Sequence, residues 1–177
     1  MRLEQRIAIA APPEVVWQAV ADWERQSEWV ALTTVTVQPS GPEIPEGSGE
    51  PGTGAPEDRE GSGEPGTGAP EDRGHGVGER LTAVTRLGPI GVTDRMQVTL
   101  WEPPRRVDVV HLGRVVRGTG TFLVEPAPGG AWFTWAEELD VPFGWLGRAG
   151  AWLLRPAGQL LLRRSLRTLA RRLEAGG

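Results

Sequence analysis

Apolar and polar residues alternate along most of this chain, and the period changes from strand to helix near each end. Residues 3–10 alternate with a period of two and run into Pro12-Pro13. Behind the prolines, Val16, Trp17 and Val20 recur at helical spacing. Proline fixes φ near the helical value and needs no donor in the first turn, so the pair predicts a helix start. The elements expected here are a strand over 3–10 and helices over about 13–21 and 24–30.

The middle of the chain consists of short runs rich in β-branched residues, each bounded by Gly or Pro. The breaks between them are short enough for hairpins, which predicts an antiparallel meander. The strands expected from these runs cover residues 32–37, 78–87, 92–102, 105–112, 115–125 and 131–141.

From about residue 143 to 174 the period is helical. The spacing of four leucines, Leu162, Leu166, Leu169 and Leu173, predicts an apolar stripe that faces the core, with arginines mainly off the stripe. Pro156 should kink or interrupt this helix before Gly158. The order is β-α-α, six strands and a long helix, which is an α+β fold.

Composition narrows the classes of function. The 177 residues suffice for one domain with a real core. Without cysteine there is no disulfide, thiolate catalysis or Cys-based metal site, and without lysine there is no Schiff-base chemistry. No apolar run is long enough to cross a bilayer, and residues 1–6 lack the apolar core of a signal peptide. We therefore expect a soluble, cytoplasmic protein.

An acidic insert interrupts this pattern at residues 39–76. Residues 46–59 read EGSGEPGTGAPEDR, and residues 60–73 repeat them without a change. The insert has nine acids and two arginines, a balance of −7, whereas the rest of the chain has a balance of +3. Its apolar content is too low to offset the entropy of ordering, so we expect it to be disordered within the single domain 1–177. A tolerated duplication and an acidic tether for a partner are both open interpretations.

The start of the chain, Pro12-Pro13-Glu14-Val15-Val16-Trp17 followed by Trp29, resembles the START-like helix-grip superfamily. The closest similarity is to the SRPBCC proteins of the polyketide cyclase/dehydrase-like type. Residues 130–135, leading into Glu137-Glu138-Leu139 and Pro142, also look like that family's last strand and entry to its long helix. The resemblance implies a curved seven-stranded antiparallel sheet that grips the long helix around an apolar cavity. Members bind lipids, sterols, quinones or polyketides, and some catalyse cyclisation. The acidic insert departs from the family pattern.

Strand alternation identifies candidate cavity residues. Asp94 shares a face with three apolar residues of its strand, and Glu137 shares a face with Phe133 and Trp135. A carboxylate in an apolar row is desolvated, which raises its pKa and suits acid-base chemistry. The alternative is that Glu137 lies at the rim of the sheet, where it is solvated or paired with an arginine. The predicted ligand-binding residues are Asp94, Met96, Val98, Leu100, Phe133, Trp135 and Trp152.

His111 shares a face with Val107 and Val109, so it is a candidate for proton transfer inside the cavity, with a structural role as the alternative. His111 and Glu137 are thus the predicted catalytic pair. No second histidine or regular acidic cluster accompanies His111, so we expect no metal. Of the eight tryptophans, Trp101, Trp135 and Trp152 are candidates to line the cavity around an aromatic ligand, with core packing as the alternative for each. The row Arg117, Thr119 and Thr121 is expected on the solvent face, and the alternative is a flipped sheet in which this row lines the cavity and binds a carboxylate or phenolate ligand.

Three functions remain open at this point. The first is a carrier or sensor of a small hydrophobic molecule, without cofactor. The second is a cyclase or dehydratase that uses His111 and Glu137. The third is an interaction protein that uses the Arg-rich helix or the acidic insert. We expect no nucleic-acid partner, leave a transient membrane contact through 145–154 as an alternative, and expect a monomer or homodimer.

Overall fold

The structure, a computed structural model, describes residues 1–38, 75–113, 116–140 and 144–176. The helices are α1 (Pro13–Ala21), the single 3₁₀ turn η1 (Gln26–Glu28) and α2 (Gly144–Ala175). The strands are β1 (Arg2–Ile9), β2 (Thr33–Gln38), β3 (Arg80–Leu87), β4 (Ile90–Glu102), β5 (Arg106–Leu112), β6 (Arg117–Ala127) and β7 (Gly130–Asp140).

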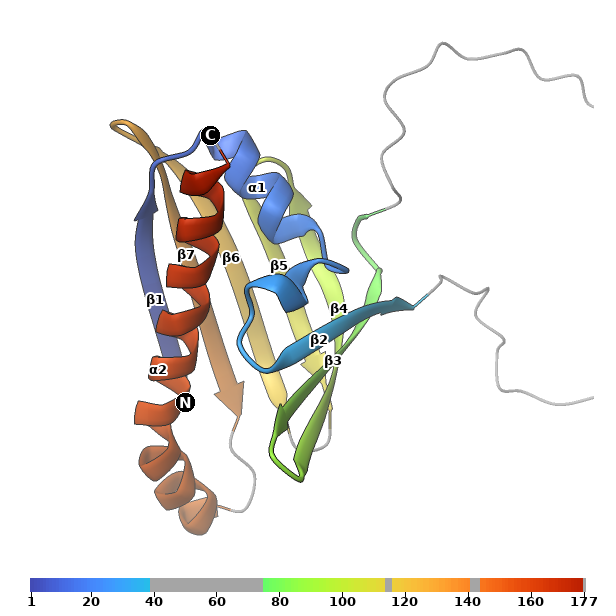
Figure 1. The fold of residues 1–177 in the computed structure, drawn as a ribbon. Helices are drawn as coiled ribbons and strands as arrows, with labels where there is room; N and C mark the ends of the chain where they lie inside the picture. Colours follow the sequence, from blue (N-terminus) through green and yellow to red (C-terminus); the bar gives the residue numbers. More distant parts are fainter. Residues whose placement is uncertain (39–74, 114–115, 141–143, 177) are drawn as a thin grey trace, which may run out of the picture.

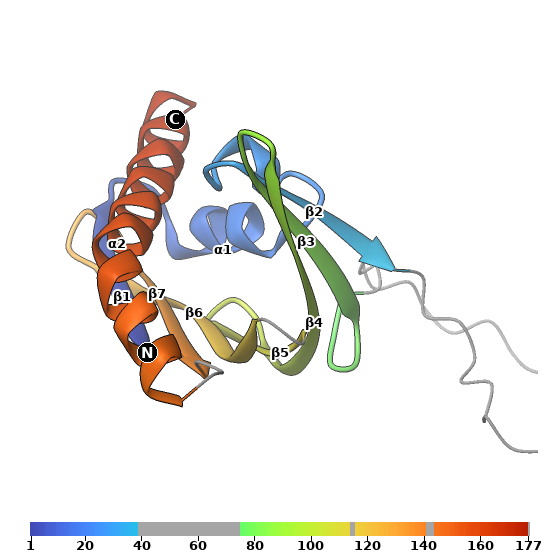
Figure 2. The ribbon, with the colours of Figure 1, turned by 90° about the horizontal axis from the view of Figure 1, so that it is seen from below.

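The seven strands form one antiparallel sheet in the order β1-β7-β6-β5-β4-β3-β2. Strands β2 to β7 follow one another as a meander, and β1 closes the far edge against β7. The sheet is curved, and α1 and α2 lie on its concave side (Figures 1 and 2). This arrangement is the α+β helix-grip architecture, so the predicted fold class is confirmed.

Helix α1 begins where the double proline predicted, with Pro13 in its first turn. Val16 and Val20 are fully buried, and they pack with Trp17 into the core. The second expected helix is reduced to η1. Its Gln26 is buried and donates a hydrogen bond from Nε2 to the carbonyl of Val20 at 3.0 Å, which folds the chain back onto α1.

Helix α2 packs its leucine stripe against the sheet, with Leu162, Leu166 and Leu169 all buried. Two contacts fix its second half to the segment after α1. The Ala31 N–H donates to Ser165 Oγ at 2.9 Å, and Arg172 pairs with Glu28. The helix therefore spans the concave face and closes it from one side (Figure 2).

Pro156 does not interrupt α2. The helix is continuous from Gly144 to Ala175 with Pro156 inside it, so of the predicted kink or interruption the interruption is wrong. Proline removes one backbone donor, and the carbonyl that loses its partner must find another. That carbonyl belongs to Trp152, which is exposed, so water can take the place of the lost donor.

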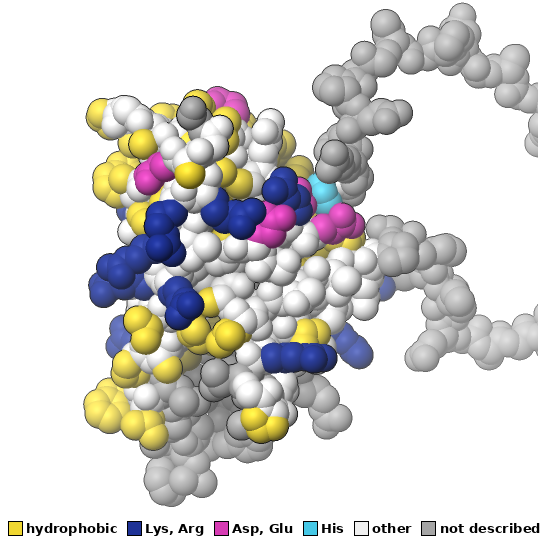
Figure 3. All heavy atoms as spheres, in the orientation of Figure 1, with side chains coloured by type: hydrophobic (Ala, Val, Ile, Leu, Met, Phe, Trp, Pro, Cys, Tyr) yellow, Lys and Arg dark blue, Asp and Glu magenta, His cyan; other side chains and the backbone are white. Residues whose placement is uncertain are grey.

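The expected insert at 39–76 lies outside the described residues except for its last two. On either side of it, Gln38 of β2 pairs directly with Arg80 of β3. Arginine side chains gather along the outer face of α2, with hydrophobic side chains beside them (Figure 3). Among the described residues, no helix is long and apolar enough to cross a membrane.

Candidate functional site

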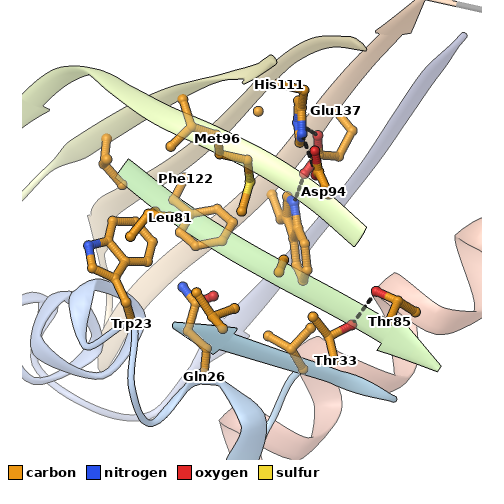
Figure 4. A pocket seen from close by; sticks show the side chains of 17 residues that line it. Trp23, Gln26, Thr33, Leu81, Thr85, Asp94, Met96, His111, Phe122 and Glu137 are labelled. Atoms are coloured by element: carbon orange, nitrogen blue, oxygen red, sulfur yellow. Dashed lines mark hydrogen bonds and ion pairs between the residues drawn. The ribbon is translucent and has the colours of Figure 1, made fainter. Parts of the chain in front are cut away.

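A cavity of about 150 Å³ lies between the concave face of the sheet and the segment that follows α1 (Figure 4). Its walls are mainly apolar, and its polar groups gather at two places. Asp94, His111 and Glu137 form one group, Thr33 and Thr85 form the other, and Gln26 lies apart from both. The lining residues are Trp23, Gln26, Val30, Thr33, Val35, Leu81, Ala83, Thr85, Asp94, Met96, Val107, Val109, His111, Gly120, Phe122, Trp135 and Glu137.

The imidazole of His111 lies between two carboxylates. Its Nδ1 is 2.6 Å from Asp94 Oδ2, and its Nε2 is 2.8 Å from Glu137 Oε2. The side chain of His111 is only 5% exposed, and those of Asp94 and Glu137 are 15% and 13% exposed. We call these three residues the acid-imidazole array.

The register of the sheet explains how the array forms. Asp94 is on β4 and His111 on the adjacent β5, but Glu137 is on β7, two strands away from β5. The strand between them, β6, has Gly120 directly opposite Glu137 and Val109. A Cβ at Gly120 would lie 3.1 Å from Glu137 Oε2 and 3.0 Å from Val109 Cγ2. The missing side chain therefore lets Glu137 reach across β6 to His111.

The array fixes the charge of His111. Burial alone would lower the pKa of the imidazole, but the hydrogen bonds to Asp94 and Glu137 and the charges of both carboxylates raise the pKa from 6.5 to about 10. His111 is thus an imidazolium at neutral pH, and each of its N–H groups donates to a carboxylate. Neither nitrogen is left for a substrate, so His111 in this state is not a free base.

The carboxylate oxygens of the array have unequal surroundings. Glu137 Oε1 accepts a hydrogen bond from Trp135 Nε1 at 2.6 Å, and one oxygen of each acid accepts from His111. The remaining oxygen, Asp94 Oδ1, is buried and has no hydrogen-bond partner in the described part of the chain. Three of the four acceptors are therefore occupied.

The family model described as "Polyketide cyclase / dehydrase and lipid transport" matches residues 1–174. The chain belongs to this family. None of the curated proteins matches it.

Solved structures share the fold with this member of the polyketide cyclase/dehydrase and lipid transport family. TTHA0849 from Thermus thermophilus has a TM-score of 0.69 at 15% identity, covering 100% of this chain and 99% of that chain. The polyketide_cyc-like protein Cgl2372 from Corynebacterium glutamicum has a TM-score of 0.58 at 20% identity, with coverages of 99% and 92%. The Aha1 dimer from Colwellia psychrerythraea has a TM-score of 0.56 at 15% identity, with coverages of 99% and 98%. At these identities the similarity shows the fold alone.

The cavity of this polyketide cyclase-family chain contains five of the residues predicted from the sequence. Asp94, Met96, His111, Trp135 and Glu137 all line it. Their roles stay predictions, because position alone does not show what they bind. The row Arg117, Thr119 and Thr121 does not line the cavity, as expected for the solvent face.

Two of the predicted ligand-binding residues lie in the hydrophobic core and do not line the cavity. Val98 is 1% exposed and Phe133 is fully buried, and neither lines the cavity. Phe133 instead packs edge-on against Trp29 and Phe122, with ring centroids 6.1 and 5.5 Å apart. Strand alternation identified their face correctly but could not show how far along the strand the cavity extends.

Leu100 and Trp152 do not line the cavity. A β-bulge between Val98 and Leu100 shifts the register with β5, so that Leu100 pairs with Asp108 and Trp101 takes the inward face opposite Val107. Trp101 packs against Trp17 and Trp23 rather than lining the cavity. Trp152 lies in the first half of α2, 77% exposed and away from the cavity.

A second buried polar cluster was missed. Glu79 is 7% exposed, and it accepts hydrogen bonds from Trp23 Nε1 at 2.9 Å and from His75 Nδ1 at 2.8 Å. The predicted insert, residues 39–76, includes His75. The available signal was alternation, because Glu79 lies two residues before Leu81 and four before Ala83, which are both buried.

The donor groups of the site do not converge as metal ligands do. Within the described ranges, no group of three or more His, Cys, Asp or Glu residues is arranged to hold a metal ion. In the array, both imidazole nitrogens are hydrogen-bonded to carboxylates, so the nitrogens and carboxylate oxygens do not point toward one shared position where a metal ion could bind. The arrangement suits binding through charge and hydrogen bonds.

Proposed function

We propose that this chain binds a small, mainly apolar molecule in the cavity, as a carrier or sensor. The observation that carries the proposal is a cavity with apolar and aromatic walls and a charged polar group, the acid-imidazole array, at one end. Such a site gains affinity from apolar burial and orients its ligand through a few polar atoms. A cavity of about 150 Å³ is the size that accepts one benzene ring. The family description, which includes lipid transport, supports binding of a hydrophobic molecule.

The test is ligand capture by the intact chain. Native mass spectrometry before and after organic extraction should show a small molecule that leaves with the solvent. Toluene added to the extracted protein should change tryptophan fluorescence, because Trp23 and Trp135 line the cavity. Ala83→Leu fills the cavity and should abolish the change, whereas Thr82→Leu, one residue away on the opposite face of β3, should preserve it. Equal responses of the two variants would contradict binding in the cavity.

A cyclase or dehydratase is the second candidate. The observation in its favour is that the two predicted acid-base residues, His111 and Glu137, are hydrogen-bonded to each other at the cavity. Because both nitrogens of His111 carry protons, it is not a base in this state, and an acid role requires one N–H to leave its carboxylate partner. Glu137→Gln should then abolish turnover of a polyketide-like substrate while its binding persists. Turnover that survives in this variant would exclude Glu137 from catalysis.

A further inference from the structure

The polar end of the cavity carries an unbalanced charge. Asp94 and Glu137 each form an ion pair with His111, and the described part of the chain provides no second cation for either carboxylate. Two carboxylates and one imidazolium leave a net charge of −1. A buried charge without a partner is costly, so a cationic group would be stabilised here and an anion would be repelled.

The unfilled hydrogen-bonding position agrees with this charge. Asp94 lines the cavity, and its Oδ1 is the one oxygen of the array without a donor among the described residues. The terminal torsion of aspartate is soft. The carboxylate can therefore turn this oxygen toward a donor in the cavity while Oδ2 remains close to His111. A ligand that brings an N–H donor would satisfy a buried acceptor that is otherwise unpaired.

The walls beside the array favour the same kind of ligand. Trp135 donates its indole N–H to Glu137, and its ring packs edge-on against Phe122 at 5.1 Å between centroids. Both rings line the cavity. An ammonium group is attracted by aromatic faces as well as by carboxylates, and an apolar body of about one ring fills the volume available.

We propose that the ligand is a small primary amine, with its ammonium group held by Asp94 and its apolar body packed against Phe122 and Trp135. The inference rests on the proposed binding function and specifies its ligand class. A purely apolar ligand would leave Asp94 Oδ1 without a donor. An acidic ligand would add to the negative charge of the array.

Four probes of nearly equal shape test the ligand class on the full chain: benzylamine, benzyl alcohol, toluene and benzoate. Isothermal titration calorimetry should show that benzylamine binds at least about tenfold more tightly than toluene, as expected for a charge-assisted hydrogen bond. Benzyl alcohol should fall between them, and benzoate should not bind. If toluene binds as well as benzylamine, the amine class is wrong and the apolar cavity stands. If no probe binds, the proposed binding function fails as well.

A substitution then assigns the effect to Asp94. Asp94→Asn keeps the size of the side chain and removes the charge, so it should abolish the preference for benzylamine over toluene. Met96→Leu is the matched control, because Met96 lines the same cavity without a charged group. It should change the affinity for all bound probes alike and leave the preference intact. A preference that persists in Asp94→Asn would overturn the assignment.

A measurement on the unmodified protein covers the case in which Asp94→Asn fails to fold. The chain has two methionines, Met1 and Met96. With ¹³C-methyl methionine labelling, the Met96 methyl should show intermolecular nuclear Overhauser effects to the benzylamine ring. Effects at Met1 alone, or at neither methyl while benzylamine binds, would place the amine outside the cavity and contradict the proposal.

Discussion

At the scale of single residues, the two hydrogen bonds of His111 couple its charge to the stability of the fold. The pKa of His111 rises from 6.5 to about 10 in the folded protein. The folded state therefore holds the proton more tightly than the unfolded state does. The resulting stabilisation is fully present below about pH 6.5 and is lost as the pH rises toward 10.

This linkage gives the first prediction. The free energy of unfolding of the wild-type chain, measured in urea, should exceed that of His111→Gln by several kcal/mol near pH 6.5, and the difference should shrink as the pH approaches 10. The comparison with His111→Gln removes the titration of groups common to both chains. A difference that stays constant over this range would mean that His111 does not carry the charge we assign to it.

Gly120 supports the second prediction. A methyl group at this position would lie 3.0 Å from Val109 Cγ2 and 3.1–3.2 Å from both carboxylate oxygens of Glu137. Gly120→Ala should therefore displace Glu137 from His111, lower the pKa of His111 and cost about 1–3 kcal/mol of unfolding free energy. NMR titration and urea unfolding measure the two effects.

Gly91→Ala is the control for Gly120→Ala, because its Cβ would meet only Arg86 Cγ at 4.0 Å. It should leave both the pKa of His111 and the stability nearly unchanged. If Gly120→Ala behaves like Gly91→Ala, Glu137 does not need the space on β6.

The same residues show how far the sequence predicts a site. The period of two within each strand correctly predicted which face Asp94, His111 and Glu137 each occupy, and in the structure this is the concave face for all three. It could not predict that Glu137 contacts His111, because that contact depends on Gly120 and on the order of three strands. It failed for Leu100, since one extra residue in a bulge reverses the face of everything after it.

At the scale of elements, buried Glu79 links the end of α1 to the beginning of β3. Trp23 lies just after α1 and is 2% exposed, and its indole N–H donates to Glu79. Glu79→Ala leaves this buried donor without an acceptor, so unfolding in urea should show a loss of about 1–3 kcal/mol. Glu79→Gln retains a carbonyl acceptor of the same length and should recover most of that loss. Equal losses in the two variants would show that the hydrogen bond to Trp23 is not what stabilises the link.

The position of Pro156 inside α2 leads to a prediction for the stability of this helix. The residue lies inside a continuous helix, and its neighbours Arg155 and Ala157 are exposed. Pro156→Ala restores one backbone hydrogen bond and removes no core contact, so stability should rise by roughly 1–3 kcal/mol. Ala157→Gly, at the next exposed position, should instead cost about 1 kcal/mol. A loss of stability in Pro156→Ala would indicate that the proline makes a contact the helix depends on.

At the scale of the whole molecule, the order of elements was predictable because each hairpin and each period is local in the sequence. The runs between Gly and Pro predicted six strands after the first, and the final leucine stripe predicted the helix that covers them. The cavity was predictable only as a family feature. Its size and its polar end depend on which side chains fill the space between the sheet and the helices. No local sequence pattern predicts the distances between those side chains.

The pairing of Gln38 with Arg80 leads to a prediction for the chain as a whole. These residues end β2 and begin β3 as direct partners, so the connection between them has only to span a hairpin. Deleting residues 46–73 removes both repeats and leaves 39–45 and 74–79, including His75 and Glu79. Loop-closure entropy varies slowly with length, so unfolding in urea should show a gain of only about 1 kcal/mol.

Charge separates the two interpretations of the repeats. The deletion removes eight acids and two arginines, which changes the net charge from −4 to +2, and the variant should move from anion- to cation-exchange resin. A second variant, with the repeats replaced by a neutral Gly/Ser segment of equal length, keeps the length and loses the charge. If the repeats are a tolerated duplication, both variants should keep the wild-type probe affinities and co-purifying partners, and only the deletion should show the small gain in stability expected from its shorter loop. If they are an acidic tether, both variants should lose the same partner while the domain stays folded. Loss of a partner in the deletion alone would show that the length of the segment, and not its charge, is what the partner requires.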